Sequence, residues 1–245
     1  MSDQFYSNIA KYYQHIFPFN PAQIEFLRHV IPYNGARILD VGCATGDLSF
    51  ALTHFGFPTW AFDFDSQMIE MALATKQEET MFPVIQHLDM RSIGEQFPNS
   101  FIDTAICFGN TLVHLLNETD IRKFINGAYE VLSPEGKLTI QILNYQYILD
   151  QKIKSLPLID NEYIRFERNY EFPENSDLID FKTKLTVKES GQVIESAVKL
   201  YPIRKTELQK ILEETGFKSF EFHGSFNRDA LTETSLPLIV TCQKK

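Results

Sequence analysis

The sequence predicts an α/β protein built on a doubly wound, mostly parallel sheet. Short apolar strands alternate with helical patterns from residue 37 to residue 143, and three of the first four strands end in an aspartate. Such alternation is typical of β-α-β units, whose ligands bind at the carboxyl ends of the strands. A third observation, polar and apolar residues in alternation after residue 145, predicts a small antiparallel insert behind the fifth strand.

The most informative stretch is RILDVGCATGDLSF, residues 37–50, in which an apolar strand carries Asp40 and then breaks into a glycine-containing turn before a helix. Gly42 and Gly46 can adopt positive φ, and the N–H groups at the helix start can hold a small polar ligand. A dinucleotide-binding turn reads G-x-G-x-x-G, whereas these glycines stand four apart with Ala44 between them. Taken alone, the turn fits an ordinary strand-to-helix connection equally well.

The second strand, residues 58–63, ends in Asp63, seventeen residues after Gly46. The ends of neighbouring parallel strands meet at one sheet edge, so this carboxylate can accept both hydroxyls of a ribose. Without the glycine turn beside it, an acid in this place would be an ordinary surface residue. Further along, we expect strands at 82–89 and 101–108, a helix at 117–132, a turn at 133–136 and a strand at 137–143.

The order of these predicted elements divides the chain into three regions. Residues 1–34 form a helical segment, which either packs on the sheet or lies over its carboxyl edge as a lid. Residues 35–144 and 204–245 form the core domain, in which Thr206 opens a capping box, Gly216 ends the helix, and strands at 217–223 and 236–243 close the sheet. Residues 145–203 form the antiparallel insert, with strands at 165–172, 178–189 and 192–200.

The composition excludes several classes of function. A formal net charge of −9 argues against nucleic acid and anionic membranes as partners. Cys43, Cys107 and Cys242 are far apart and form no C-x-x-C pair, so neither a disulfide framework nor a metal site is expected. The chain shows no signal peptide and no apolar run of membrane-spanning length, which predicts a cytoplasmic protein.

Five stretches in this order resemble the class I, Rossmann-like, S-adenosylmethionine-dependent methyltransferases of small-molecule type: DVGCATG, AFDFDSQMIEMA, HLDM, FIDTAICFGNTLVHL and VLSPEGKLTIQILN. The resemblance implies a seven-stranded sheet whose last strand is antiparallel. It also implies S-adenosyl-L-methionine as cofactor, S-adenosyl-L-homocysteine as product, and methyl transfer to nitrogen or oxygen of a small-molecule acceptor. Ala44 and Glu135 stand where the usual motifs have glycine.

The resemblance also implies the residues that hold the cofactor. Asp63 would bind the ribose hydroxyls, Met68 would lie against the adenine, and Asp89 would read the adenine amino edge with the backbone of Met90. The remaining implied cofactor residues are Asp40, Gly42, Cys43, Ala44, Gly46, Phe64, Phe108, Gly109 and Asn110.

Methyl transfer from a sulfonium needs alignment and exclusion of water, and a base is optional. His114, six residues after the fourth strand, is either a catalytic base or a packed histidine, the second being the commoner situation for a single histidine. Tyr13 is a second catalytic candidate. Candidates for the acceptor site are Tyr12, Asn110, Tyr145 and Arg168, the last two in the region where relatives place substrate contacts.

Two other functions remain open from the sequence. One is a non-catalytic S-adenosylmethionine-binding or regulatory protein, which a poorly defined base would suit. The other is an NAD-dependent oxidoreductase, against which the glycine spacing speaks.

Overall fold

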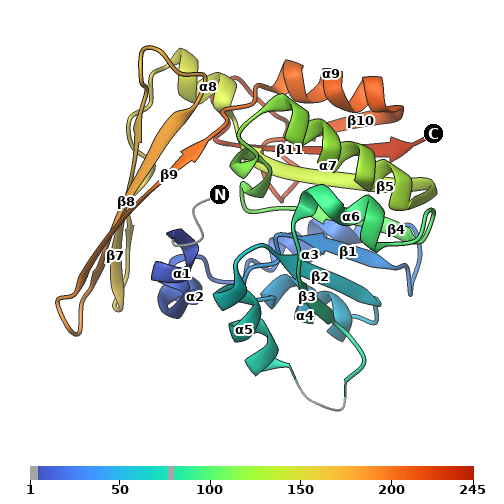
Figure 1. The fold of residues 1–245 in the computed structure, drawn as a ribbon, viewed down its shortest axis with the longest axis horizontal. Helices are drawn as coiled ribbons and strands as arrows, with labels where there is room; N and C mark the ends of the chain where they lie inside the picture. The colour runs from blue at the N-terminus through green and yellow to red at the C-terminus, as the bar shows by residue number, and fades with distance from the viewer. Residues whose placement is uncertain (1–4, 77–79) are drawn as a thin grey trace.

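A seven-stranded sheet forms the centre of the protein, and a four-stranded sheet stands beside it (Figure 1). The computed structural model describes residues 5–76 and 80–245. The central strands run in the order β10-β11-β5-β4-β1-β2-β3, and only β11 is antiparallel to its neighbours β5 and β10 among the described pairings. Their bounds are β1 (Ile38–Val41), β2 (Thr59–Asp63), β3 (Val84–His87), β4 (Ile102–Cys107), β5 (Leu132–Leu143), β10 (Phe217–His223) and β11 (Pro237–Lys244). The predicted fold class, insert included, is confirmed.

Helices cover both faces of the central sheet. Ile38 of β1 packs with α3 (Ala22–Arg28) and α4 (Asp47–His54), while the next residue, Leu39, faces α7 (Glu118–Val131) and α9 (Lys205–Thr215). Successive side chains of a strand point to opposite faces, so β1 is apolar on both and is fully buried. Five further helical segments follow the first strands: α5 (Ser66–Thr75), η2 (Met90–Ser92), α6 (Ile93–Gln96), η3 (Thr111–His114) and α8 (Tyr145–Asp150).

Helix α7 shows why the sequence folds in this way. Its buried residues Ile121, Phe124, Ile125, Ala128 and Val131 repeat at helical spacing and form one apolar stripe. Burial of each large apolar side chain stabilises the fold by about 1.5–3 kcal/mol. At the start of the helix, the side chain of Asn117 accepts a hydrogen bond from the backbone of Asp120 at 2.8 Å.

Residues 133–136, expected as a turn, fall within the bounds of β5, but they interrupt its pairing: Glu135 has a φ of 62°, and the register with β4 shifts between Leu132 and Lys137. The capping box expected at Thr206 is wrong. The N-cap residue of α9 is Arg204, two residues earlier, and it makes no side-chain capping bond. The end of α9 at Gly216, with a φ of 114°, is confirmed.

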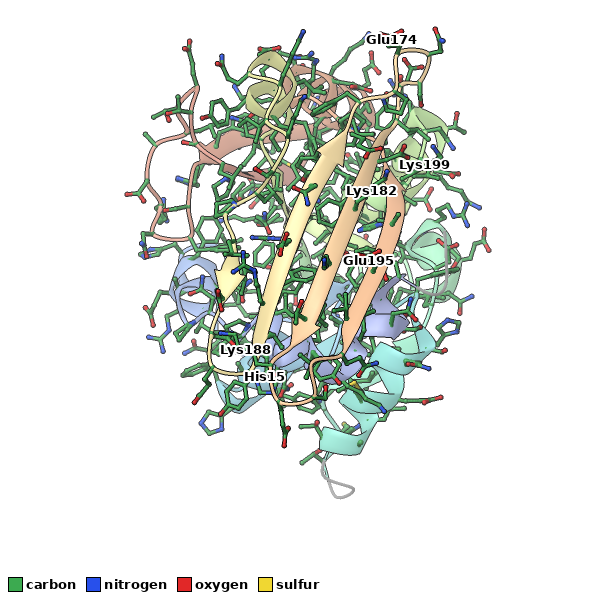
Figure 2. All side chains as sticks on the ribbon, turned by 90° about the vertical axis from the view of Figure 1, so that its left-hand side faces the viewer. His15, Glu174, Lys182, Lys188, Glu195 and Lys199 are labelled. Carbon is green, nitrogen blue, oxygen red and sulfur yellow. The ribbon has the colours of Figure 1, made fainter. Side chains whose placement is uncertain are left out.

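The four-stranded sheet lies within residues 145–203 and consists of β6 (Ile159–Asp160), β7 (Ile164–Glu171), β8 (Ile179–Val187) and β9 (Val193–Leu200). Figure 2 looks onto its outer face, where Lys182, Lys188 and Lys199 pair with carboxylates at 2.6, 2.5 and 3.1 Å. Exposed pairs of this kind contribute little stability, and they mark a face that water covers.

The inner face of this sheet packs on the N-terminal segment. Helices α1 (Phe5–Ile9) and α2 (Tyr13–Ile16), joined by η1 (Ala10–Tyr12), lie between the small sheet and the body of the protein (Figure 1). Phe5 and Ile9 form a buried cluster with Phe166 and Leu185 of the sheet. The segment therefore connects the two sheets. No helix in the described part of the chain has the length and apolarity that a membrane crossing requires.

Candidate active site

Two adjoining cavities lie at the carboxyl ends of β1, β2 and β4. The larger measures about 450 Å³ and the smaller about 90 Å³. Because their walls are shared, one elongated ligand can extend through both. The residues common to both walls are Tyr6, Tyr13, Gly42, Ala44, Gly109 and His114.

The loop after β1 forms the floor between the cavities. Gly42 has a φ of 74°, and a Cβ there would fall on the methyl group of Thr111 and lie 2.7 Å from its Oγ1. Only glycine accommodates both the dihedral and the contact. Ala44 adopts a φ of 48°, an uncommon and mildly strained conformation for a residue with a Cβ. Gly46, with a φ of 82°, is the N-cap of α4 and lies outside both linings.

Asp63, at the end of β2, holds this loop in place. Its Oδ2 accepts a hydrogen bond from the backbone N–H of Ala44 and its Oδ1 from that of Asp65, both at 2.9 Å. Burial raises the pKa of the Asp63 carboxyl, and the backbone donors oppose that shift. Asp63 also lines the smaller cavity, where its free lone pairs can accept further hydrogen bonds.

The rest of the smaller cavity is mainly apolar. Phe64, Met68 and Met90 line it, and Met68 is 1% exposed. A carboxylate at one end of an apolar slot suits a ribose joined to a flat base.

The wall of the larger cavity next to β1 is acidic. Asp40 is 3% exposed and accepts a hydrogen bond from Ser49 Oγ at 2.5 Å. Burial raises the pKa of the Asp40 carboxyl to about 7, although the Ser49 hydroxyl lowers it. Asp47, at the start of α4, lines the same cavity. A cationic ligand group beside these carboxylates would stabilise their charged forms.

The segment after β4 forms the opposite side. Asn110 has a φ of 67°, and its side-chain oxygen accepts a hydrogen bond from the backbone of Leu143 at 3.0 Å. The amide of Gly109 donates to Gln141 Oε1 at 2.8 Å. Asn110 Nδ2 lies 2.9 Å from the hydroxyl of Tyr145, which is fully buried and outside both linings. Tyr145 therefore holds Asn110 and does not face the cavity.

His114 is the last residue of η3 and lies against the N-terminal segment. Its Nε2 lies 2.9 Å from the hydroxyl of Tyr6, and the imidazole lines both cavities. Burial lowers the His114 pKa to about 4, so the ring is neutral at neutral pH. Burial also raises the pKa of Tyr13, whose side chain lines both cavities and keeps its proton. The two catalytic candidates are thus a neutral imidazole, His114, and a protonated phenol, Tyr13.

The structure brings most of the predicted site residues together, but not all. Tyr12 points to Gln192, with its hydroxyl 3.4 Å from that amide, and lies outside both linings. Asp89 also lies outside them, because its carboxylate caps η2 and pairs with Arg91 at 2.5 Å. Arg168 does line the larger cavity. So do Asp40, Cys43, Phe108 and Asn110, while Asp63, Phe64, Met68 and Met90 line the smaller one.

Three residues of the site gave no signal in the sequence. Tyr6 belongs to an apolar helical pattern that reads as packing, Gln141 sits within a strand, and Thr111 follows the fourth strand without a charge. Tyr6 and Gln141 act through His114 and Gly109, which are far along the chain, and Thr111 lies against Gly42. Spacing in the sequence does not reveal these contacts.

Together these features define a class: an α/β protein that binds a nucleoside-containing, cationic small molecule along the carboxyl edge of its sheet. The donor set fits S-adenosylmethionine, with a carboxylate and an apolar slot for the adenosine part and an acidic wall for the cationic part. When bound, that cofactor supplies a methyl group activated by its sulfonium.

Comparisons with known proteins agree. Residues 38–136 match the family described as "Methyltransferase domain". The glycine/sarcosine N-methyltransferase of Aphanothece halophytica is 28% identical over 217 residues, covering 82% of this chain and 73% of that protein. The enzyme of the same name from Halorhodospira halochloris is 29% identical over 210 residues, covering 84% and 75%.

Solved structures share the fold. The CcbJ methyltransferase of Streptomyces caelestis superposes with a TM-score of 0.83 at 16% identity, covering 100% of this chain and 99% of that one. An S-adenosylmethionine-dependent methyltransferase of Clostridium acetobutylicum gives 0.80 at 16% identity, covering 98% of each chain. The protein is a class I S-adenosylmethionine-dependent methyltransferase. It is an enzyme that transfers the methyl group to nitrogen or oxygen of a small-molecule acceptor.

Proposed function

We propose that this enzyme methylates the nitrogen of a small amino compound that also carries a carboxylate. In this proposal Asp63 binds the ribose, the wall of Asp40 and Asp47 faces the cationic end of the cofactor, and residues 145–203 select the acceptor. The single observation that carries the proposal is Arg168.

Arg168 places a positive charge on the wall of the larger cavity formed by β7. Its Nη2 donates to the backbone oxygen of Pro157 at 2.7 Å, while its Nε is buried without a hydrogen-bond partner in the described residues. No carboxylate in the described part of the chain forms an ion pair with it. A buried donor that lacks a partner costs about 1–3 kcal/mol, which a bound carboxylate would recover.

The titratable side chains that line the cavity favour methylation of a nitrogen atom over methylation of an oxygen atom. A neutral amine can attack the methyl group without prior loss of a proton, whereas a hydroxyl acceptor generally needs a base. His114 has a lowered pKa and Tyr13 a raised one, so neither can readily take a proton from a hydroxyl. We propose that His114 accepts a hydrogen bond from the amine and orients its lone pair, and that Tyr13 helps to exclude water.

The names of the relatives support this acceptor class, because glycine and sarcosine are both amines that carry a carboxylate. We also infer that nucleic acid is not a partner, since the net charge is −9.

The test measures S-adenosylhomocysteine formation with amino acids, with amines that lack a carboxylate, and with phenols. We expect turnover with carboxylate-bearing amines. Arg168→Gln should raise KM for them about tenfold or more, because a charge-assisted hydrogen bond contributes about 1.5–3 kcal/mol.

Arg165→Gln is the matched control, since Arg165 lies on the outward face of the same strand and pairs with Asp160 and Glu167. It should leave KM unchanged. Equal turnover of amines with and without a carboxylate, or an unaltered KM in Arg168→Gln, would contradict the proposal. Faster turnover of a phenol would show that oxygen is the acceptor atom.

A further inference from the structure

The rim of the larger cavity carries two exposed aromatic rings. Phe17 and Phe19 are 36% and 38% exposed, and both line this cavity together with Pro18. Large apolar side chains left in water at the mouth of a ligand cavity commonly mark a binding surface. The same cavity is apolar further in, with Ile16 and Leu156 in its lining.

The position of Phe17 relative to Arg168 sets the geometry. Phe17 packs edge-on against Phe166, with ring centroids 6.1 Å apart. Phe166 and Arg168 are two residues apart on β7 and point to the same face, so they lie roughly 7 Å apart along the strand. Phe166 thus links the two groups: Phe17 packs on it and Arg168 follows it on the same face of β7, so the guanidinium and the ring of Phe17 line one cavity within reach of the two ends of a single small molecule.

If glycine were the acceptor, the rings of Phe17 and Phe19 would stay exposed to water. An acceptor with no side chain can bind through its carboxylate and its amine, but it has no further group to place against the rings of Phe17 and Phe19. An amino acid with a large apolar or aromatic side chain can fill both places, and it would remove the exposed rings from water.

We propose that Phe17 and Phe19 form a side-chain subsite, and that the acceptor is an amino acid with an aromatic or large apolar side chain. The proposal rests on the proposed function, because it takes Arg168 as the site of the carboxylate. It assigns this chain an acceptor class different from the one in the names of its relatives, glycine and sarcosine.

The test is calorimetric titration of the protein saturated with S-adenosylhomocysteine, using L-phenylalanine and glycine as probes. Binding is measured without turnover, so the result does not depend on which atom is methylated. We expect phenylalanine to bind at least tenfold more tightly than glycine. Phe19→Ala should weaken phenylalanine binding about tenfold and leave glycine binding unchanged.

Phe55→Ala is the control, because Phe55 is a similarly exposed phenyl ring, 49% exposed, that lies outside both cavity linings. It should change neither affinity. Glycine binding as tightly as phenylalanine, or no binding of either, would overturn the subsite. So would weaker S-adenosylhomocysteine binding in Phe19→Ala, which would assign the rings to the cofactor. If Arg168→Gln leaves phenylalanine affinity unchanged while Phe19→Ala lowers it, the proposed function fails and the aromatic subsite remains.

Discussion

Replacing Asp40 by asparagine should change how the stability of the ligand-free protein depends on pH. Burial raises the Asp40 pKa from its ordinary value of 3.8 to about 7. The folded state therefore keeps a proton between pH 4 and 7 that the unfolded state has released. Stability falls as pH rises through this interval, and above pH 7 the cost reaches about 4 kcal/mol as an upper bound, at 1.36 kcal/mol per unit.

Asparagine carries no charge at any of these pH values, so this part of the pH dependence should disappear. The observable is the difference in Tm between Asp40→Asn and wild type, measured by calorimetry from pH 4 to 8.5. A pH-independent offset from the new amide group drops out of that comparison. We expect the Tm of Asp40→Asn minus that of wild type to increase between pH 4 and 7 and to stay constant above pH 7. For a chain of this size each kcal/mol moves Tm by about 2–4 °C, so the total change should reach several degrees.

Ser49→Ala provides an internal check. The Ser49 hydroxyl lowers the Asp40 pKa, so its removal should raise that pKa further and extend the decline in stability above pH 7. Wild-type and Asp40→Asn curves that run parallel over the whole range would refute the reasoning, because Asp40 would then carry no buried charge cost.

Three further predictions concern the loop and the N-terminal segment. Asp63→Asn should weaken S-adenosylhomocysteine binding about tenfold in calorimetry while the fold persists, because the amide oxygen still accepts one loop hydrogen bond; full affinity would remove Asp63 from the ribose site. Ala44→Gly should stabilise the protein by about 1 kcal/mol in urea unfolding, since glycine adopts positive φ without strain, and Gly42→Ala should destabilise it; the opposite signs would contradict the loop geometry. Tyr6→Phe should lower kcat more than it raises the cofactor Kd, because it frees the His114 ring to rotate; an unaltered kcat would show that the Tyr6 hydroxyl does not orient that ring.

Much of the fold was predictable because its signals are local. The short run that contains Asp40 ends at Val41, where strand β1 ends, and the glycines that follow adopt the positive φ values that the pattern suggests. Asp63 was predictable for a different reason: parallel strands bring their ends together whatever the loops do. These inferences need only a few neighbouring residues and one rule of topology.

The errors and omissions share a cause: the direction of a side chain depends on its hydrogen-bond and ion-pair partners, which strand and helix patterns do not predict. Asp89 has the expected place after β3, but Arg91 two residues later takes up its carboxylate. Tyr145 follows the end of strand β5 by two residues, so a place in the site was expected. Its hydroxyl instead bonds to Asn110 and does not face the cavity. Tyr6 reads as one more apolar helical residue until the structure places its hydroxyl beside His114.

The N-terminal segment also constrains when the active site can form. Tyr6 bonds to His114, 108 residues later, and Asn8 bonds to Ser196, 188 residues later, at 3.3 Å. Contacts with such sequence separation are costly in loop-closure entropy and form late in folding. During synthesis, residues 5–17 leave the ribosome long before strand β9 exists. The N-terminal wall of the active site therefore lacks its partners in the small sheet until synthesis has passed strand β9. A nascent chain that has reached the end of β5 holds five adjacent strands of the central sheet, but it lacks the small sheet against which the N-terminal segment packs, so it cannot yet enclose a methyl donor.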